Sequence, residues 1–136
     1  MTKKNSTTKI IIKDDCGNSP KAQFIKEFNK AFAQPDKEFI LGCFAEDATW
    51  RMVGGTSWTG KESLAKAIDS MGDESATELE INTIISHGKY CAASGSISYA
   101  NGTKIEFCDM YEFSSHAKDA KIQFLTGYAI ESQSAN

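Results

Sequence analysis

The stretch Lys104–Phe113, KIEFCDMYEF, reads as a β-strand with one residue out of place. Side chains alternate between the two faces of a strand, so its odd-numbered positions share one face. That face carries apolar and aromatic residues with an acid, Asp109, in the middle: Ile105, Phe107, Tyr111 and Phe113. An acid on an apolar face must be paired, neutralised or used. We therefore expect this strand to line a ligand cavity.

The composition indicates one globular domain and disfavours several partners. The chain has 136 residues, of which 40% are hydrophobic and 24% charged, enough for a single buried core. A net charge of −3 without a cluster of basic residues disfavours nucleic acid. The apolar run Ile10–Ile12 is too short for a signal peptide, and no run approaches the roughly 20 residues that cross a membrane. We predict a cytoplasmic protein that binds neither nucleic acid nor membrane.

The cysteines and histidines form no metal-binding pattern. The chain has four cysteines and two histidines, with no C-x-x-C pair and with His87 far from His116 in sequence. We therefore expect free thiols, no metal site and no cofactor.

The order of patterns along the chain predicts helices first and then long strands. Ser19 and Pro20 mark a helix start, and apolar residues recur at helical spacing to about Ala33. Asp36 can cap a second helix, whose inward residues would be Phe39, Ile40, Cys43 and Phe44. Residues 48–53 form a strand and residues 60–71 a third helix. From Ala76 the period becomes two, which predicts four further strands. The class is α+β, with three N-terminal helices packed on a strongly curved, mostly antiparallel sheet.

Turn residues predict how these strands pair. Asn101-Gly102 is a strong signal for a two-residue hairpin loop, and His87-Gly88 is a second candidate. These loops would place Ser94 opposite Asp109 and Ser96 opposite Phe107. Small residues would then occupy the centre of the face, which leaves a cavity under the helices unless Phe24, Phe28 or Phe32 fill it. The expected surround is Leu79, Ile81, Ile85, Phe107, Tyr111 and Phe113, with Phe124, Thr126 and Tyr128 from the last strand.

The opposite face of the sheet is also apolar, and no helix remains to cover it. Its expected members are Ile84, Cys91, Ala93, Ile97, Tyr99, Cys108 and Met110. An uncovered apolar face of this kind favours self-association, so we predict a homodimer through the outer sheet face.

Three stretches in this order resemble a known superfamily. They are AFAQPDKEFILGCFAEDATW, the helix entry WTGKESL, and the strand KIEFCDMYEF. Together they resemble the nuclear transport factor 2-like superfamily, in particular its SnoaL-like and ketosteroid isomerase-like members. The resemblance implies a cone-shaped α+β barrel with a deep pocket, commonly dimeric through the sheet. We divide the chain into an N-terminal arm (1–18), a SnoaL-like domain (19–131) and a tail (132–136).

The catalytic residues of the superfamily carry over only in part. The position of the ketosteroid isomerase base falls on Met52, whose thioether cannot take a proton. The oxyanion-hole tyrosine of the first helix corresponds to Phe28, whereas the protonated aspartic acid donor corresponds to Asp109. The Arg-x-Asp pair of the epoxide-opening members is also missing. These departures argue against either chemistry.

Asp109 is the candidate catalytic or ligand-orienting group, and the alternative is a structural acid satisfied by Ser94 and backbone amides. The leading hypothesis is a protein that binds a small, largely apolar organic molecule. The expected ligand-binding residues are Phe28, Trp50, Met52, Trp58, Ser94, Phe107, Tyr111, Thr126 and Tyr128. Two alternatives stay open: a lyase, isomerase or cyclase with Asp109 as general acid, and a dimeric interaction module that uses the outer sheet face.

Overall fold

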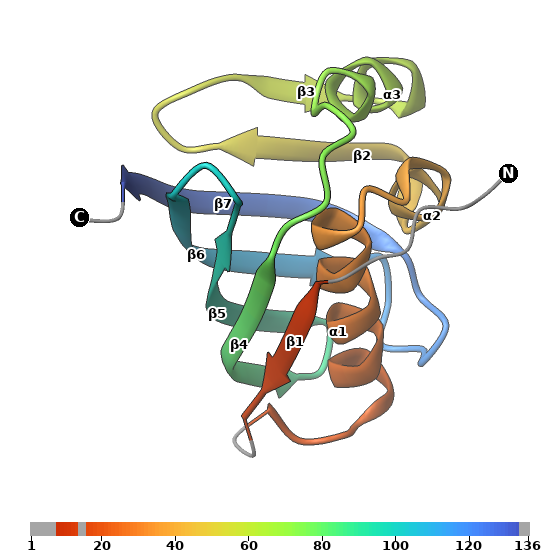
Figure 1. Ribbon diagram of the computed structural model, residues 1–136. Coiled ribbons are helices and arrows are strands. Elements are labelled where there is room, and N and C mark those ends of the chain that lie inside the picture. Colours follow the sequence, from red (N-terminus) through yellow and green to blue (C-terminus); the bar gives the residue numbers. More distant parts are fainter. Residues whose placement is uncertain (1–7, 14–15, 134–136) are drawn as a thin grey trace, which may run out of the picture.

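The structure, a computed structural model, describes residues 8–13 and 16–133, which form three helices and one seven-stranded sheet (Figure 1). The helices are α1 (Pro20–Ala33), α2 (Lys37–Gly42) and α3 (Lys61–Asp69). The strands are β1 (Lys9–Ile12), β2 (Phe44–Met52), β3 (Ser57–Thr59), β4 (Glu78–His87), β5 (Tyr90–Ser98), β6 (Thr103–Phe113) and β7 (Ile122–Gln133).

The sheet has the order β1-β4-β5-β6-β7-β2-β3 and is open, with β1 and β3 at its edges. The sheet of the expected cone-shaped α+β barrel is therefore not closed. The β1–β4 and β2–β7 pairs are parallel and the other four pairs are antiparallel, so the mostly antiparallel α+β class is confirmed.

The first two helices begin at the predicted caps. The Ser19 hydroxyl accepts a hydrogen bond of 3.2 Å from the Ala22 amide, and Pro20 needs no partner because it has no N–H. The Asp36 carboxylate accepts one of 3.2 Å from the Phe39 amide. The Phe39 side chain is 43% exposed, so its predicted inward position is wrong. No helix in residues 8–13 and 16–133 is long and apolar enough to span a membrane.

The helices cover one face of the sheet, which we call the inner face. Helix α1 packs on β4 and β5, and α3 packs on β2 and β3 (Figure 1). Phe28 of α1 is 1% exposed, and its ring lies 5.8 Å from that of Phe44 and 6.0 Å from that of Tyr111. This aromatic contact joins α1 to β2 and β6 and forms the centre of the core.

The hairpin between β5 and β6 has a three-residue loop, Ala100–Gly102, instead of the predicted two-residue loop. Gly102 has φ +92°, a conformation that favours glycine, and the Tyr99 amide donates to the Thr103 carbonyl. Every pair therefore moves by one residue, and Asp109 lies opposite Ala93. A one-residue shift transfers side chains to the other face. The predicted inward positions of Ser94 and Ser96 are thus wrong, and Ala93 and Gly95 take their place.

Strand β4 contains a bulge that inverts its alternation. Ile81 pairs with Gly95 and Thr83 pairs with Ser94, which leaves Asn82 as the extra residue. After the bulge, Ile84 is 6% exposed and Ile85 is 60% exposed, the reverse of the prediction. The turn also moves by one residue to Gly88-Lys89.

A second bulge, in β7, also inverts the alternation of its strand. Glu112 pairs with Phe124 and Phe113 pairs with Ile122, so Gln123 is the extra residue. Leu125 is consequently buried, whereas the predicted inward residues Phe124, Thr126 and Tyr128 belong to the outer face.

The outer face is apolar, although its members differ from the predicted set. Cys108 and Met110 lie on it as expected. Ile84, Cys91, Ala93 and Ile97 are instead buried on the inner side. The exposed large apolar residues of this face are Ile85, Tyr90, Met110, Phe124, Tyr128 and Ile130.

Candidate functional site

A cavity of about 280 Å³ lies between α1 and the inner face of the sheet. Its lining is mainly apolar and aromatic, with one carboxylic acid. The lining residues are Asn29, Phe32, Trp50, Met52, Met71, Leu79, Ile97, Tyr99, Ile105, Phe107, Asp109 and Ala129.

Small residues in the neighbouring strands create the space around the middle of β6. Asp109 lies between Ala93 of β5 and Gly127 of β7. Phe107, two residues earlier, pairs with Gly95 and Ala129 in the same way. Side chains this small leave volume beside Asp109 that a larger residue would occupy. The cavity follows from these neighbours, because the register excludes the predicted serines.

Gly127 of β7 pairs with Asp109 and packs against two residues of the lining, Met52 and Asp109. A Cβ atom built on it would come within 2.9 Å of the Met52 Sδ and 3.2 Å of the Asp109 Oδ1. Both distances are tighter than ordinary van der Waals contact, so the close packing of Met52 and Asp109 depends on the missing side chain. The glycine therefore brings β7 against the carboxyl group.

The carboxyl group of Asp109 has no hydrogen bond or ion pair to any residue that the structure describes. Every fully buried side-chain nitrogen or oxygen in that part of the chain has a partner, so the Asp109 oxygens are open to the cavity. Burial raises the pKa of this carboxyl from 3.8 to about 7. Asp109 therefore changes its charge near neutral pH. The structural alternative, in which Ser94 satisfies it, is wrong because Ser94 lies on the other face.

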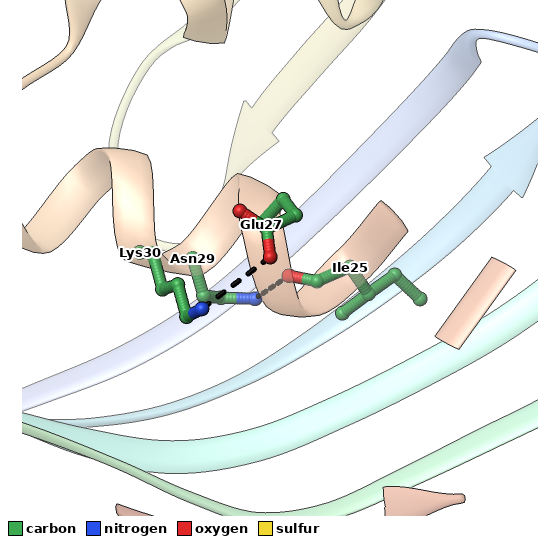
Figure 2. A network of polar contacts seen from close by, with 4 residues as sticks. All are labelled: Ile25, Glu27, Asn29 and Lys30. Atoms are coloured by element: carbon green, nitrogen blue, oxygen red, sulfur yellow. Dashed lines mark hydrogen bonds and ion pairs between the residues drawn. The ribbon is translucent and has the colours of Figure 1, made fainter. Parts of the chain in front are cut away.

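Asn29 of α1 supplies a second polar side chain to the cavity lining. Its side-chain amide Nδ2 donates to the Ile25 carbonyl at 2.9 Å, as Figure 2 shows, and to the Tyr111 hydroxyl at 3.2 Å. These two bonds fix the amide group and leave its carbonyl oxygen, Oδ1, as an acceptor on the cavity side. Lys30 pairs with Glu27 at 3.3 Å on the exposed surface of α1 (Figure 2).

Tyr111 lies below the cavity and is 2% exposed. Burial raises its pKa well above the ordinary value, and the nearby Asp109 carboxyl raises it further. Tyr111 is therefore a neutral phenol at physiological pH, and its hydroxyl already accepts from Asn29. It positions Asn29 and supplies no base.

Aromatic rings form one wall of the cavity. The Trp50 ring lies 5.7 Å from that of Phe32 with an interplanar angle of 71°, so the two rings form a corner. Trp58 packs behind Trp50 at 5.2 Å and supports it from outside the lining. Such edge-to-face contacts hold ring positions firmly.

The structure brings together part of the predicted site. Trp50, Met52, Phe107 and Asp109 line the cavity. Phe28 and Tyr111 pack beneath it in the core, and Trp58 supports the wall. The predicted inward positions of Ser94, Thr126 and Tyr128 are wrong, because the longer loop and the bulge in β7 place them on the outer face.

The lining residues that sequence reasoning missed are Asn29, Met71, Ile97, Tyr99 and Ala129. Asn29 is a polar residue between Phe28 and Phe32 on the apolar side of α1, and that position was an available signal. Tyr99 was missed because the predicted register placed it on the outer face. Within the described ranges, no three histidine, cysteine, aspartate or glutamate side chains gather closely enough to hold a metal ion.

The open α+β sheet with three helices and a cavity above β6 defines a nuclear transport factor 2-like protein. The profile of the SnoaL-like domain family matches residues 25–123, which is most of the chain. The chain therefore belongs to the SnoaL-like domain family, as its sequence predicted. No protein with a curated description matches it.

Solved structures share this fold at low sequence identity. A nuclear transport factor 2-like protein of unknown function from Burkholderia xenovorans has a TM-score of 0.68 and 21% identity, covering 86% of this chain and 88% of its own. An LEH-like epoxide hydrolase from M. tuberculosis has a TM-score of 0.64 and 15% identity, covering 79% of this chain and 80% of its own. A protein with a ketosteroid isomerase-like fold from Catenulispora acidiphila was solved in complex with trimethylamine. Its TM-score is 0.63 and its identity is 13%, covering 78% of this chain and 84% of its own.

Proposed function

We propose that this SnoaL-like protein binds a small, largely apolar organic molecule in the cavity under α1, with Asp109 as the group that orients it. The observation that carries the proposal is an acid without a protein partner, open to an otherwise apolar cavity. A carboxyl group buried in an apolar cavity is unfavourable unless a ligand or a water molecule forms hydrogen bonds with it. The Catenulispora protein of similar fold holds a small organic molecule, which supports this use of the fold.

The cavity volume sets the size of the ligand. At about 280 Å³ it lies just below the roughly 300–1,000 Å³ of pockets that hold drug-sized molecules. A compact ligand with one polar group therefore suits the lining. Met52 and Met71 add flexible thioethers that adapt to the ligand's outline.

Substitution of Gly127 tests the proposal. Gly127→Ala crowds Met52 and Asp109, so we expect it to weaken the binding of any small molecule that a screen of neutral organic compounds finds. Gly42→Ala is the matched control, since a Cβ there meets nothing within 4 Å. Ligand-observed NMR measures binding, and circular dichroism checks the fold of each variant. Ligands that bind wild-type protein and Gly127→Ala equally would place the binding site elsewhere.

A catalytic use of Asp109 is the second candidate. A general acid works best when its pKa lies near the working pH, and Asp109 has a pKa of about 7. A lyase, isomerase or cyclase reaction also needs a base, and the cavity lining contributes no histidine, lysine or second acid. The base would then have to come from the substrate. Bound ligand recovered unchanged after long incubation would rule out this candidate.

We further propose a homodimer through the outer sheet face. The supporting observation is the row of exposed apolar side chains on that face, among them Ile130 at 74% exposed and Tyr128 at 49%. The interaction module predicted as an alternative would use the same surface. The cytoplasmic location stays a prediction from the sequence.

A further inference from the structure

The lining combines acceptor oxygens from Asp109 and Asn29 with a Tyr99 hydroxyl, which can donate or accept, and a Trp50 indole N–H, which can only donate. Asp109 offers its carboxyl oxygens, and Asn29 offers Oδ1 because its nitrogen is already bonded to Ile25 and Tyr111. The described residues of the lining include no lysine, arginine or histidine. The cavity therefore has an excess of negative potential and no positive group of its own.

Aromatic rings add to this negative potential. Phe32, Trp50, Tyr99 and Phe107 all contribute to the lining. The face of an aromatic ring attracts a cation, and tryptophan does so most strongly. Phe32 and Trp50 meet edge to face at 71°, and Trp50 also packs against Phe44 and Trp58. These contacts hold the rings in place, and a desolvated cation in the cavity would contact the ring surface that the lining leaves open.

We propose that the ligand of this cavity is a compact organic cation, a tertiary or quaternary alkylammonium whose charge lies against Asp109 and whose alkyl groups contact the aromatic rings. This inference rests on the proposed function, because it names the ligand class for the same cavity. A neutral carbonyl compound is the contrasting ligand. It would place its oxygen near the acceptor oxygen of Asn29 and would need Asp109 in its protonated form.

The charge of Asp109 gives the two ligand classes opposite pH dependences. Among the described residues, Tyr111 on the same strand interacts electrostatically with Asp109, and Tyr99 is the other titratable group of the lining; both are phenols without positive charge. The acid therefore titrates near pH 7 because of burial alone. A cation binds the ionised carboxylate, so its affinity rises with pH, whereas a carbonyl needs the protonated acid and its affinity falls.

Calorimetric titration with choline tests the inference. Choline is a permanent cation, and 3,3-dimethylbutan-1-ol is its uncharged carbon analogue of nearly the same shape. We expect choline to bind about tenfold more tightly at pH 8 than at pH 6, because the ionised fraction of Asp109 rises by that factor. Titration in buffers of different ionisation enthalpy should show about 0.9 proton released per choline at pH 6 and about 0.1 at pH 8. The alcohol should show no rise in affinity with pH.

Two variants assign the effect to the acid in the cavity. Asp109→Asn keeps the shape and removes the charge, so choline should lose its pH dependence and bind at least about tenfold more weakly at pH 8. Glu106→Gln is the matched control, since Glu106 is an exposed carboxylate on the opposite face of the same strand. It should bind choline as the wild-type protein does. The pH dependence of the wild-type protein tests the inference even if Asp109→Asn does not fold.

Several results would overturn the inference, and they separate it from the proposed function. If the alcohol binds as tightly as choline at pH 8, or if choline affinity falls with pH, the cation is wrong but the cavity still binds a ligand. The same conclusion follows if choline does not bind, whereas neutral compounds bind the wild-type protein and fail to bind the Gly127→Ala variant. If neither choline nor any neutral compound binds, both proposals fail.

Discussion

Each face of β6 carries an acid, and the two acids lie in different surroundings. The inward residues Phe107 and Asp109 and the outward residues Met110 and Glu112 alternate within one short stretch. Glu112 lies 3.9 Å from the Lys89 ammonium on the outer face, whereas Asp109 has no charged partner among the described residues. The helices above the sheet and the small residues beside Asp109 make one face a cavity and leave the other exposed.

The largest effect on the free energy of unfolding is expected at Gly95, where the backbones of β4 and β5 approach each other closely. A Cβ on Gly95 would lie 2.1 Å from the Glu80 carbonyl oxygen, next to the bulge at Asn82. We expect Gly95→Ala to lower the free energy of unfolding by about 3–5 kcal/mol, because backbone must move to relieve the clash. Urea denaturation measures this, with Gly42→Ala as the control that should be neutral. A loss below about 1 kcal/mol would contradict the bulge and the register built on it.

The second largest effect concerns the pH dependence of the free energy of unfolding, to which the acids of the two faces should contribute differently. The folded protein keeps the Asp109 proton between about pH 4 and pH 7, whereas the unfolded chain releases it, so this group makes stability fall as pH rises through that window. The rise in pKa corresponds to about 2–4 kcal/mol after allowance for water at the cavity opening.

Asp109→Asn should remove most of this decline, so that the variant gains stability relative to wild type as the pH rises from 4 to 8. Thermal and urea unfolding at several pH values measure it. Glu106→Gln, the control on the outer face, should keep the wild-type slope. An unchanged slope in Asp109→Asn would show that the cavity does not penalise the carboxylate.

The smallest effect on stability is expected on the outer face. Ile130 is 74% exposed, so Ile130→Lys should change the free energy of unfolding by less than about 0.5 kcal/mol. The same change places a charge in the proposed dimer surface and should shift the protein towards monomer in sedimentation velocity. Gln23→Lys, on the exposed side of α1, is the control. A wild-type protein that is already monomeric at micromolar concentration would contradict the dimer.

The sequence predicted the helices well because their signals are local. Ser19, Pro20 and Asp36 determine where α1 and α2 begin through hydrogen bonds within one turn. The α+β class and the unusual position of Asp109 also followed from periodicity alone.

The residues around Asp109 were predicted less well because register is a tertiary property. The extra residues Asn82 and Gln123 and the third loop residue each reversed a face, and none has a distinct sequence pattern. The spacing of residues along the chain does not predict a bulge, because the register depends on contacts between segments that are far apart in the sequence. One signal was available: Gly127 and Ala129 supply small residues of the same parity, as an inner face with a cavity requires.

The central claim is that Asp109 is an unpaired acid open to the cavity, and its titration tests that claim most directly. NMR observation of the Asp109 side-chain carboxyl carbon as a function of pH, assigned with Asp109→Asn, gives its pKa in the ligand-free protein. The account predicts a midpoint at about 7. A midpoint near the ordinary value of 3.8 would show a solvated or paired carboxylate and would contradict the account.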